Sequence, residues 1–212
     1  MAVQACGPQV RRASMMAHLP NLLTLSRIGA IPVLALIFLL PAPAGPWLAF
    51  AVFAIAGITD YLDGHFARSR QLQSRLGALL DPIADKLFVA AVIFILIAAG
   101  RLDGLNVLPA AVILCREIVI SGLREFLAGL NVDLPVNRLS KWKTAAQMTA
   151  MGLLLLAPAM PFGLPLHGSG IALLWAAAAL TLVTGVGYMR IGLGHAALPG
   201  GAEPPRAPRV GP

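Results

Sequence analysis

Apolar and polar stretches alternate along the chain. Six segments are mainly apolar and approach the length of about 20 residues that a helix needs to cross the hydrocarbon core of a bilayer. They are residues 22–40, 47–64, 83–100, 105–127, 144–160 and 170–188. Turn-forming Pro and Gly residues cluster in the connections 41–46 and 161–168. The pattern predicts an all-α integral membrane protein with six transmembrane helices.

The composition supports this fold class. Hydrophobic residues make up 58% of the chain and charged residues only 12%, which is too little polar surface to cover a soluble globule. The net charge of +7 does not indicate nucleic-acid binding, because the basic residues lie between apolar runs and form no stripe with stacking aromatics. The two cysteines, Cys6 and Cys115, give no support for a disulfide framework.

The basic residues predict an orientation. All of the 16 Lys and Arg residues except Arg101 lie in the segments 68–86 and 116–143 or toward the two termini, where Arg27 at the start of the first span is counted with the amino-terminal end. The positive-inside rule therefore places both termini in the cytoplasm, with a polar active-site cavity facing that side. We expect a multi-pass protein of a bacterial cytoplasmic (inner) membrane, surrounded by membrane lipids. Its parts are an amino-terminal cytoplasmic extension (1–18), a six-span domain (19–190) and a flexible cytoplasmic tail (191–212).

Acidic residues are rare but clustered. Four of the nine acids lie at the cytoplasmic ends of the second and third predicted spans: Asp60, Asp63, Asp81 and Asp85. Each charge at the centre of a membrane helix costs about 2.5–3.5 kcal/mol, and unpaired carboxylates also repel one another. On helices, the spacings i, i+3 and i, i+4 place each pair on one face. The four carboxylates are therefore expected to converge.

Divalent cations would compensate such a cluster. Four hard oxygen ligands without nearby Cys or a His cluster favour Mg²⁺ or Mn²⁺ over zinc, and carboxylates can bridge two ions that clamp phosphoryl oxygens. Individual acids have simpler interpretations. Asp81 before Pro82 is a suitable helix N-cap, and Asp60 or Asp63 could pair with nearby basic residues, which are Arg68, Arg70 and Lys86.

These residues form a recognisable motif. Asp60-Tyr-Leu-Asp63-Gly64-His-Phe-Ala67-Arg68, followed at fixed spacing by Gly77, Asp81 and Asp85, resembles the signature of the CDP-alcohol phosphatidyltransferases. The resemblance implies that Asp60, Asp63 and Asp81 coordinate metal. It also implies that Asp85 contacts metal and removes a proton from the acceptor hydroxyl. The spacing alone leaves open which carboxylate is the base.

The same resemblance implies a site for the CDP-linked lipid. In the family pattern Gly64 and Gly77 leave room for the cytidine nucleotide and Arg68 meets its phosphates, near Asp60. Residues 20–27 resemble the amino-terminal segment of the family, where Asn21, Thr24 and Arg27 approach the nucleotide. Other interpretations remain open, since the glycines could serve helix packing, Asn21 could cap a helix, and Arg27 and Arg68 could anchor helix ends.

A second basic region indicates the acceptor. Arg116, Arg124, Lys141 and Lys143 lie near the cytoplasmic ends of the fourth and fifth spans, where they could bind a substrate phosphate or simply follow the positive-inside rule. The surrounding residues 116–126 and 141–148 resemble the phosphatidylglycerophosphate synthase branch, which implies CDP-diacylglycerol as donor and glycerol 3-phosphate as acceptor. Ser140 departs from the Gly that this branch commonly has before its lysine pair.

The resemblance covers roughly residues 19–190 and also implies a homodimer. Gly- and Ala-rich stretches at 91–100 and 175–187 would permit the required close helix contacts. Alternatives are the same reaction with another alcohol, such as inositol phosphate or serine, or a membrane transporter. Against a transporter, the acids lie at one membrane edge and no inverted repeat is visible.

Overall fold

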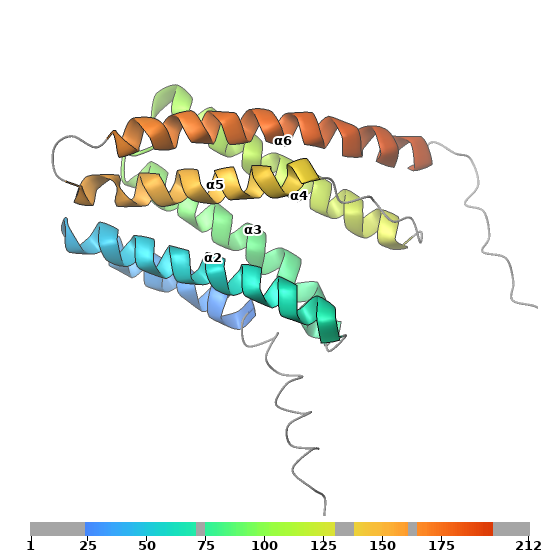
Figure 1. The fold of residues 1–212 in the computed structure, drawn as a ribbon, viewed down its shortest axis with the longest axis horizontal. Helices are drawn as coiled ribbons and strands as arrows, with labels where there is room; N and C mark the ends of the chain where they lie inside the picture. Colours follow the sequence, from blue (N-terminus) through green and yellow to red (C-terminus); the bar gives the residue numbers. More distant parts are fainter. Residues whose placement is uncertain (1–23, 71–74, 130–137, 161–164, 197–212) are drawn as a thin grey trace, which may run out of the picture.

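The computed structural model describes residues 24–70, 75–129, 138–160 and 165–196. Within these ranges, only the backbone is described for residues 60–70, 75–79, 81, 138 and 191–196. The described chain is helical apart from short turns (Figure 1). Its long helices are Thr24–Ile37, α2 (Ala44–Arg70), α3 (Arg75–Ala98), α4 (Val107–Gly129), α5 (Arg138–Leu156) and α6 (Leu166–Ala196). The predicted all-α class with six helices is confirmed. Asn21, the extension 1–18 and residues 197–212 lie outside the described residues.

Several helices extend beyond the apolar segments that predicted them. α2 continues six residues past position 64 to Arg70, α3 begins at Arg75 instead of residue 83, and α5 begins at Arg138 instead of residue 144. The added turns are rich in Arg, Lys, Leu and Ala, which favour helix without being uniformly apolar. Hydropathy therefore marks only the apolar portion of each helix.

Within the described residues, two stretches are long and apolar enough to cross a membrane. They are Gly104–Gly129 and Leu166–Arg190. Two shorter apolar helices, Thr24–Ile37 and Ala44–Thr59, accompany them.

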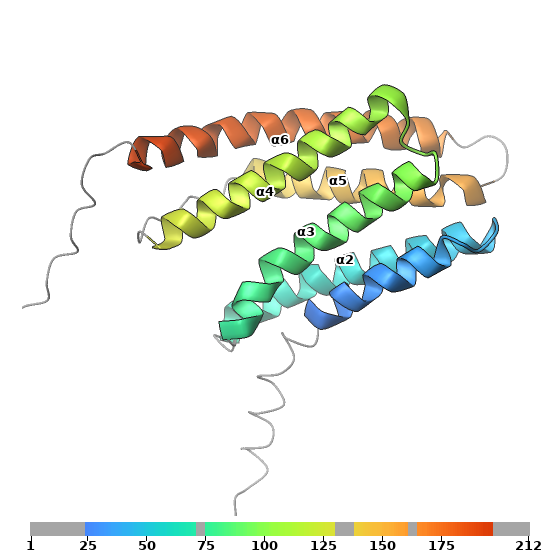
Figure 2. The same cartoon turned by 180° about the vertical axis from the view of Figure 1, so that it is seen from behind.

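The helices pack as a bundle in which α5 contacts α6 and α2, while α4 contacts α6 and α3 (Figures 1 and 2). Fully buried Met151 and Leu154 of α5 and Leu174 of α6 form the centre of one interface. The rings of Phe53 in α2 and Phe88 in α3 stack with centroids 5.8 Å apart. This apolar core fixes the relative positions of the helices that carry the motif residues predicted from the sequence.

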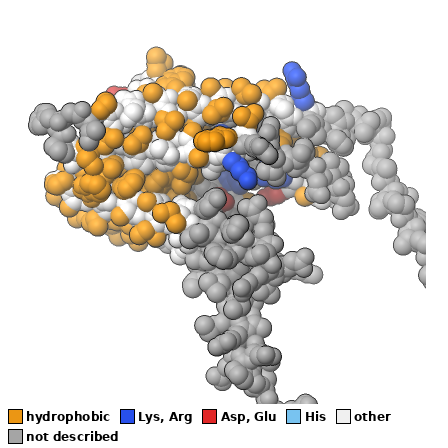
Figure 3. Space-filling model, in the orientation of Figure 1, with side chains coloured by type: hydrophobic (Ala, Val, Ile, Leu, Met, Phe, Trp, Pro, Cys, Tyr) orange, Lys and Arg blue, Asp and Glu red, His pale blue; other side chains and the backbone are white. Residues whose placement is uncertain are grey.

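The surface has two different ends. Figure 3 shows apolar side chains over most of the visible face, whereas the Lys, Arg, Asp and Glu side chains in view lie mainly toward the end where α2 ends and α5 begins. Many large apolar side chains are exposed along the helices, among them Leu36, Ile55, Phe94 and Val183. The arrangement agrees with an apolar belt below a charged end.

Arg101 lies at the opposite end and has a structural role. Its guanidinium donates hydrogen bonds to the carbonyl oxygens of Leu154 and Leu155, at 3.1 and 3.0 Å. These carbonyls are in the last turn of α5, where helix geometry leaves them without helical partners. Burial lowers the pKa of Arg101, but a guanidinium remains charged at neutral pH. The exception to the charge asymmetry is thus a helix cap.

We expect Arg101→Met to destabilise the fold without changing substrate affinity. Losing charged hydrogen bonds to two carbonyls should cost about 1.5–3 kcal/mol, which lowers the melting temperature by several degrees. Thermal unfolding in detergent measures the first effect, and steady-state KM values measure the second. Asp103→Asn is the matched control at the same end, because Asp103 makes no side-chain cap hydrogen bond. A variant as stable as the parent protein would contradict the assignment.

Candidate active site

A polar cavity of about 270 Å³ opens between the helix Thr24–Ile37, α2, α3, α4 and α5. It is the place where charged side chains from separate helices meet. The polar residues in its wall are Arg27, Asp85, Lys86, Glu117, Arg124, Thr144 and Gln147. Side chains of both charges in an otherwise apolar bundle can offset one another's desolvation, and they give the cavity the means to hold charged groups.

Arg27 and Asp85 form an ion pair across this wall. The Arg27 side chain is only 8% exposed, whereas that of Asp85 is 44% exposed and so remains accessible from the cavity. Thr24 is buried one turn before Arg27 on the same helix. The structure thus brings together the predicted base and one residue of the predicted nucleotide segment, a pairing that the sequence did not indicate.

The other three acids of the motif are described by backbone only. Asp60 and Asp63 lie within α2 and Asp81 lies in the second turn of α3, so both pairs have the helical spacing that was expected. Their side chains are not among those described, nor is that of Arg68, and the surroundings of Gly64 and Gly77 are likewise outside the description. The convergence of the four carboxylates stays a prediction.

The helix-cap interpretation of Asp81 is wrong. α3 begins six residues earlier, at Arg75, and contains Pro82 within the helix. Pro82 is the eighth residue of α3, beyond the first turn, so it removes one backbone hydrogen bond of the helix, while the preceding Leu and Ala residues favour helix formation. An acid inside a helix that leads into an apolar span has no capping function, so a different reason is needed for its presence.

The donor chemistry fits a hard divalent cation. Of the four acids in the motif, Asp85 is the one whose side chain is described. For this reason no group of three His, Cys, Asp or Glu that could hold a metal is found among the described side chains. The accessible carboxylate of Asp85 on a polar cavity is a suitable oxygen ligand for Mg²⁺ or Mn²⁺. The remaining ligands would come from Asp60, Asp63 and Asp81.

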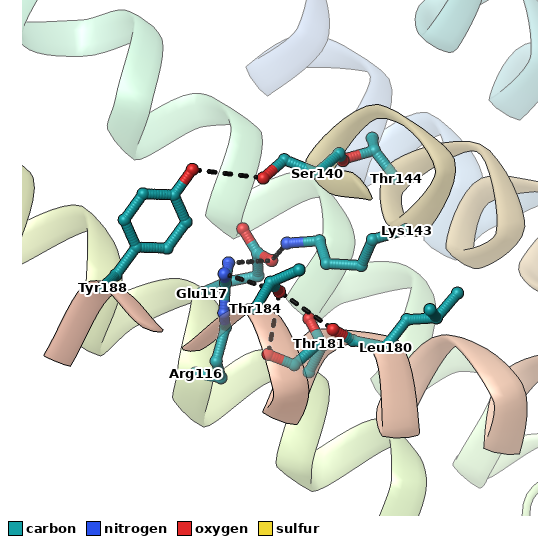
Figure 4. Close-up of polar contacts among 9 residues, drawn as sticks. All are labelled: Arg116, Glu117, Ser140, Lys143, Thr144, Leu180, Thr181, Thr184 and Tyr188. Atoms are coloured by element: carbon teal, nitrogen blue, oxygen red, sulfur yellow. Dashed lines mark hydrogen bonds and ion pairs between the residues drawn. The ribbon is translucent and has the colours of Figure 1, made fainter. Parts of the chain in front are cut away.

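Glu117 organises the basic region. It accepts hydrogen bonds from Lys143 of α5 and, at 3.4 Å, from Arg116 of its own helix (Figure 4). Lys143 is 4% exposed, so its ammonium is buried against the carboxylate. Arg116 also donates to the Thr184 hydroxyl at 3.1 Å. Two of the predicted phosphate ligands are therefore held together by one carboxylate.

Tyr188 of α6 joins the same cluster. Its ring lies beneath the guanidinium groups of Arg116 and Arg124, whose central carbons are 5.7 and 5.8 Å from the ring centroid. The phenolic oxygen is 3.2 Å from the hydroxyl of Ser140 (Figure 4). Lys141 is exposed on α5, and within the described residues no hydrogen bond or ion pair joins it to the others. Three of the four predicted basic residues thus come together.

The sequence interpretation missed the contribution of α6. Thr181, Thr184 and Tyr188 lie at i, i+3 and i+7, which places them on one face of an otherwise apolar helix. This polar stripe was a readable signal. Gly185 lies on the same stretch, and a Cβ there would be 3.3 Å from the Arg116 side chain, so the missing side chain lets Arg116 lie close to the helix. For Glu117 the sequence showed only that it follows Arg116 in the chain, and gave no sign of its contact with Lys143.

An apolar groove adjoins the polar cavity. It lies between α2 and α5, has a volume of about 450 Å³ and is lined by residues such as Phe50, Ile58 and Leu153. Gly57 and Met148 line both the groove and the cavity. The two spaces together offer a polar compartment beside an apolar one, which suits a ligand with a charged head and hydrocarbon tails.

Comparison with known proteins agrees with the site. The family model described as CDP-alcohol phosphatidyltransferase matches residues 17–183. A protein of Rickettsia bellii named CDP-diacylglycerol--glycerol-3-phosphate 3-phosphatidyltransferase is 43% identical, covering 82% of this chain and 94% of the relative. A protein of the same name from Cereibacter sphaeroides is 37% identical, covering 81% and 94%.

A differently named relative is also similar. A cardiolipin synthase (CMP-forming) of Oryza sativa subsp. japonica is 43% identical over 81% of this chain and 56% of its own length. The matched family region contains the whole acidic motif and the basic cluster, and the resemblance of residues 60–85 to the family signature is confirmed. The chain therefore belongs to the CDP-alcohol phosphatidyltransferase family.

Proposed function

We propose that this protein transfers the phosphatidyl group of CDP-diacylglycerol to glycerol 3-phosphate, giving phosphatidylglycerophosphate and CMP. The observation that carries the proposal is the joint placement of Asp85 and of the Glu117 and Arg124 side chains on one polar cavity. A base and a phosphate-binding cluster are what the transfer to a phosphorylated alcohol requires. The names of the relatives from Rickettsia bellii and Cereibacter sphaeroides support the same reaction.

In this mechanism Asp85 takes the proton of the acceptor hydroxyl. The hydroxyl oxygen then attacks the phosphorus that bears the diacylglycerol, and the bond from that phosphorus to the bridging oxygen breaks, so that CMP leaves. Arg27 lies against Asp85 and is placed to orient the carboxylate. Two Mg²⁺ or Mn²⁺ ions, held by Asp60, Asp63, Asp81 and Asp85, would polarise the pyrophosphate and neutralise its charge.

We assign the donor to the two adjoining spaces. Asn21, Thr24, Arg27 and Arg68, with Gly64 and Gly77 giving room, would surround the nucleotide beside Asp60. The hydrocarbon tails would extend into the groove between α2 and α5, since Gly57 and Met148 line both compartments. A lipid donor that enters sideways from a bilayer suits this arrangement.

The proposed setting is a bacterial cytoplasmic membrane, crossed by the domain of residues 19–190. The charged end would face the cytoplasm and the apolar belt would contact lipid, which the gathering of charged side chains in Figure 3 supports. Glycerol 3-phosphate and CMP would then exchange with the cytoplasm directly. A homodimer is part of the proposal, and the size of the purified protein in detergent would test it.

An acceptor panel tests the reaction. Purified protein with CDP-diacylglycerol should form phosphatidylglycerophosphate from glycerol 3-phosphate, detected by mass spectrometry, and should react much more slowly with serine or inositol phosphate. Phosphatidylglycerol belongs in the panel because one relative is named cardiolipin synthase. Turnover of phosphatidylglycerol without turnover of glycerol 3-phosphate would replace the proposed acceptor.

The proposed phosphate site, formed by Arg116, Arg124, Lys141 and Lys143, predicts selective kinetic effects. Arg116→Ala and Lys143→Ala should each raise the KM for glycerol 3-phosphate by about tenfold or more, since a charge-assisted hydrogen bond contributes roughly 1.5–3 kcal/mol. The KM for CDP-diacylglycerol should change little. Steady-state kinetics in detergent with both substrates varied measures the difference.

Arg190→Ala is the matched control for these variants. Arg190 is an exposed arginine on α6 and, within the described residues, has no hydrogen bond, ion pair or ring contact with the cluster around Glu117 and Tyr188. Its loss should leave both KM values near those of the parent enzyme. If Arg116→Ala and Lys143→Ala behave like this control, or lower only the amount of folded protein, the residues are helix anchors and not phosphate ligands.

A further inference from the structure

The phenol of Tyr188 is a junction between three helices. The residue is 6% exposed on α6, its ring lies under two arginines of α4, and its hydroxyl is 3.2 Å from Ser140 of α5. Arg116 and Arg124 are more than two turns apart on α4, so their side chains must approach each other to share one ring. Glu117 pairs with Arg116, but the Tyr188 ring is the contact that the two guanidinium groups share.

The ring face supplies that attraction. An aromatic ring is negative on its face, so it stabilises a guanidinium placed above it, more strongly when the contact is shielded from water. Glu117 also attracts Arg116, at 3.4 Å, and shares its charge with Lys143, whereas among the described residues no carboxylate forms an ion pair with Arg124. A ring fixes the position of a guanidinium without using its N–H groups, which lie in the guanidinium plane.

The hydrogen bonds of the two arginines fit this reasoning. The Arg116 Nε atom is buried and has no hydrogen-bond partner among the described residues. Arg124 lines the polar cavity, and no carboxylate among the described residues forms an ion pair with it. One N–H of each terminal nitrogen of Arg116 is used by Glu117 and Thr184. A guanidinium carries a second N–H on each of these nitrogens, and these donors, together with those of Arg124, are the ones that a ligand could use. Lys143 is held by the same Glu117.

We infer that Tyr188 is a positioning residue that holds Arg116 and Arg124 ready for the phosphate of the acceptor, and that Ser140 fixes the ring through its hydroxyl. The inference rests on the proposed function, since it names what prepares the phosphate site. It also gives a role to Ser140, which departs from the Gly common at this position. The Tyr188 ring itself need not touch the substrate.

Three variants separate the ring from its hydroxyl. Tyr188→Leu removes both, Tyr188→Phe keeps the ring, and Ser140→Ala removes the hydrogen-bond partner of the hydroxyl. We expect Tyr188→Leu to raise the KM for glycerol 3-phosphate by roughly tenfold, with kcat and the KM for CDP-diacylglycerol within about threefold of the parent. Tyr188→Phe and Ser140→Ala should each raise the acceptor KM by less than about threefold, because they keep the ring under both arginines.

Equal losses in Tyr188→Leu and Tyr188→Phe, or equal changes in both KM values, would overturn the inference and leave Tyr188 as a packing residue. If Tyr188→Leu does not fold, pentafluorophenylalanine at position 188 replaces it, since fluorination reverses the charge of the ring face at nearly constant shape. Its acceptor KM should exceed that of Tyr188→Phe, and an equal value would refute the role. The parent enzyme is assayed first, so a failure of the proposed function shows as absent turnover of glycerol 3-phosphate before any variant is compared.

Discussion

Asp85→Asn should lower kcat by about 10²–10⁴-fold, the range over which a positioned general base contributes. The amide keeps the shape of the carboxylate but cannot take the proton of the acceptor hydroxyl, and it is a weaker ligand for a divalent cation. Binding of CDP-diacylglycerol should persist in part, because the nucleotide and the tails have other contacts. Single-turnover kinetics and a separate binding measurement in detergent distinguish the two effects.

Asp103→Asn provides the matched control. The substitution is the same, and Asp103 is an exposed acid at the far end of the bundle with no side-chain cap hydrogen bond. It should retain turnover within about twofold of the parent, as surface substitutions usually change little. Melting temperatures of both variants show whether Asp85→Asn remains folded, since its loss leaves Arg27 without the ion pair. Near-normal turnover of folded Asp85→Asn would remove Asp85 from the base role.

Removal of divalent metal should abolish turnover reversibly. Charge stabilisation by bound ions contributes several kcal/mol to such transfers, and each 1.36 kcal/mol corresponds to a factor of ten, so the loss should be about 10³-fold or greater. Addition of Mg²⁺ or Mn²⁺ after chelation should restore the rate. Zn²⁺ should restore it poorly, since the proposed ligands are all carboxylates.

A folding control belongs with this experiment. The chelated protein should keep its helical circular-dichroism spectrum, because the apolar core around Phe53 and Phe88 does not depend on the acidic motif. Full turnover by chelated enzyme would reject a metal mechanism. Loss of helicity together with activity would indicate that the ions serve the fold and would withdraw their catalytic assignment.

The sequence predicted the number and order of the helices because apolar length is a strong and local signal. It placed the helix boundaries less well. The first turns of α3 and α5 combine helix-favouring residues with charge, so hydropathy alone ended these helices too early. This error affected the interpretation of Asp81, because Asp81 would be the N-cap of α3 only if the helix began after it.

The candidate site was predicted unevenly for a similar reason. The motif acids are close in sequence, so their spacing alone indicated a cluster. The contacts of Glu117 with Lys143 and of Tyr188 with Arg116 join residues that are far apart in the chain. Such pairs depend on how α4, α5 and α6 pack, and one sequence gives no direct signal for that. The polar stripe on α6, which the sequence interpretation missed, would have indicated an inward face but not its partners.

The junction at Gly57 and Met148 has a kinetic meaning. If tails leave the cavity sideways through the groove between α2 and α5, the donor approaches by diffusion in two dimensions while glycerol 3-phosphate approaches in three. The effective concentration of the donor is then its mole fraction in the bilayer or micelle, and dilution with inert detergent at constant bulk amount slows the reaction. A cell could therefore regulate flux through this enzyme by the lipid composition around it, without changing the amount of either protein or soluble acceptor.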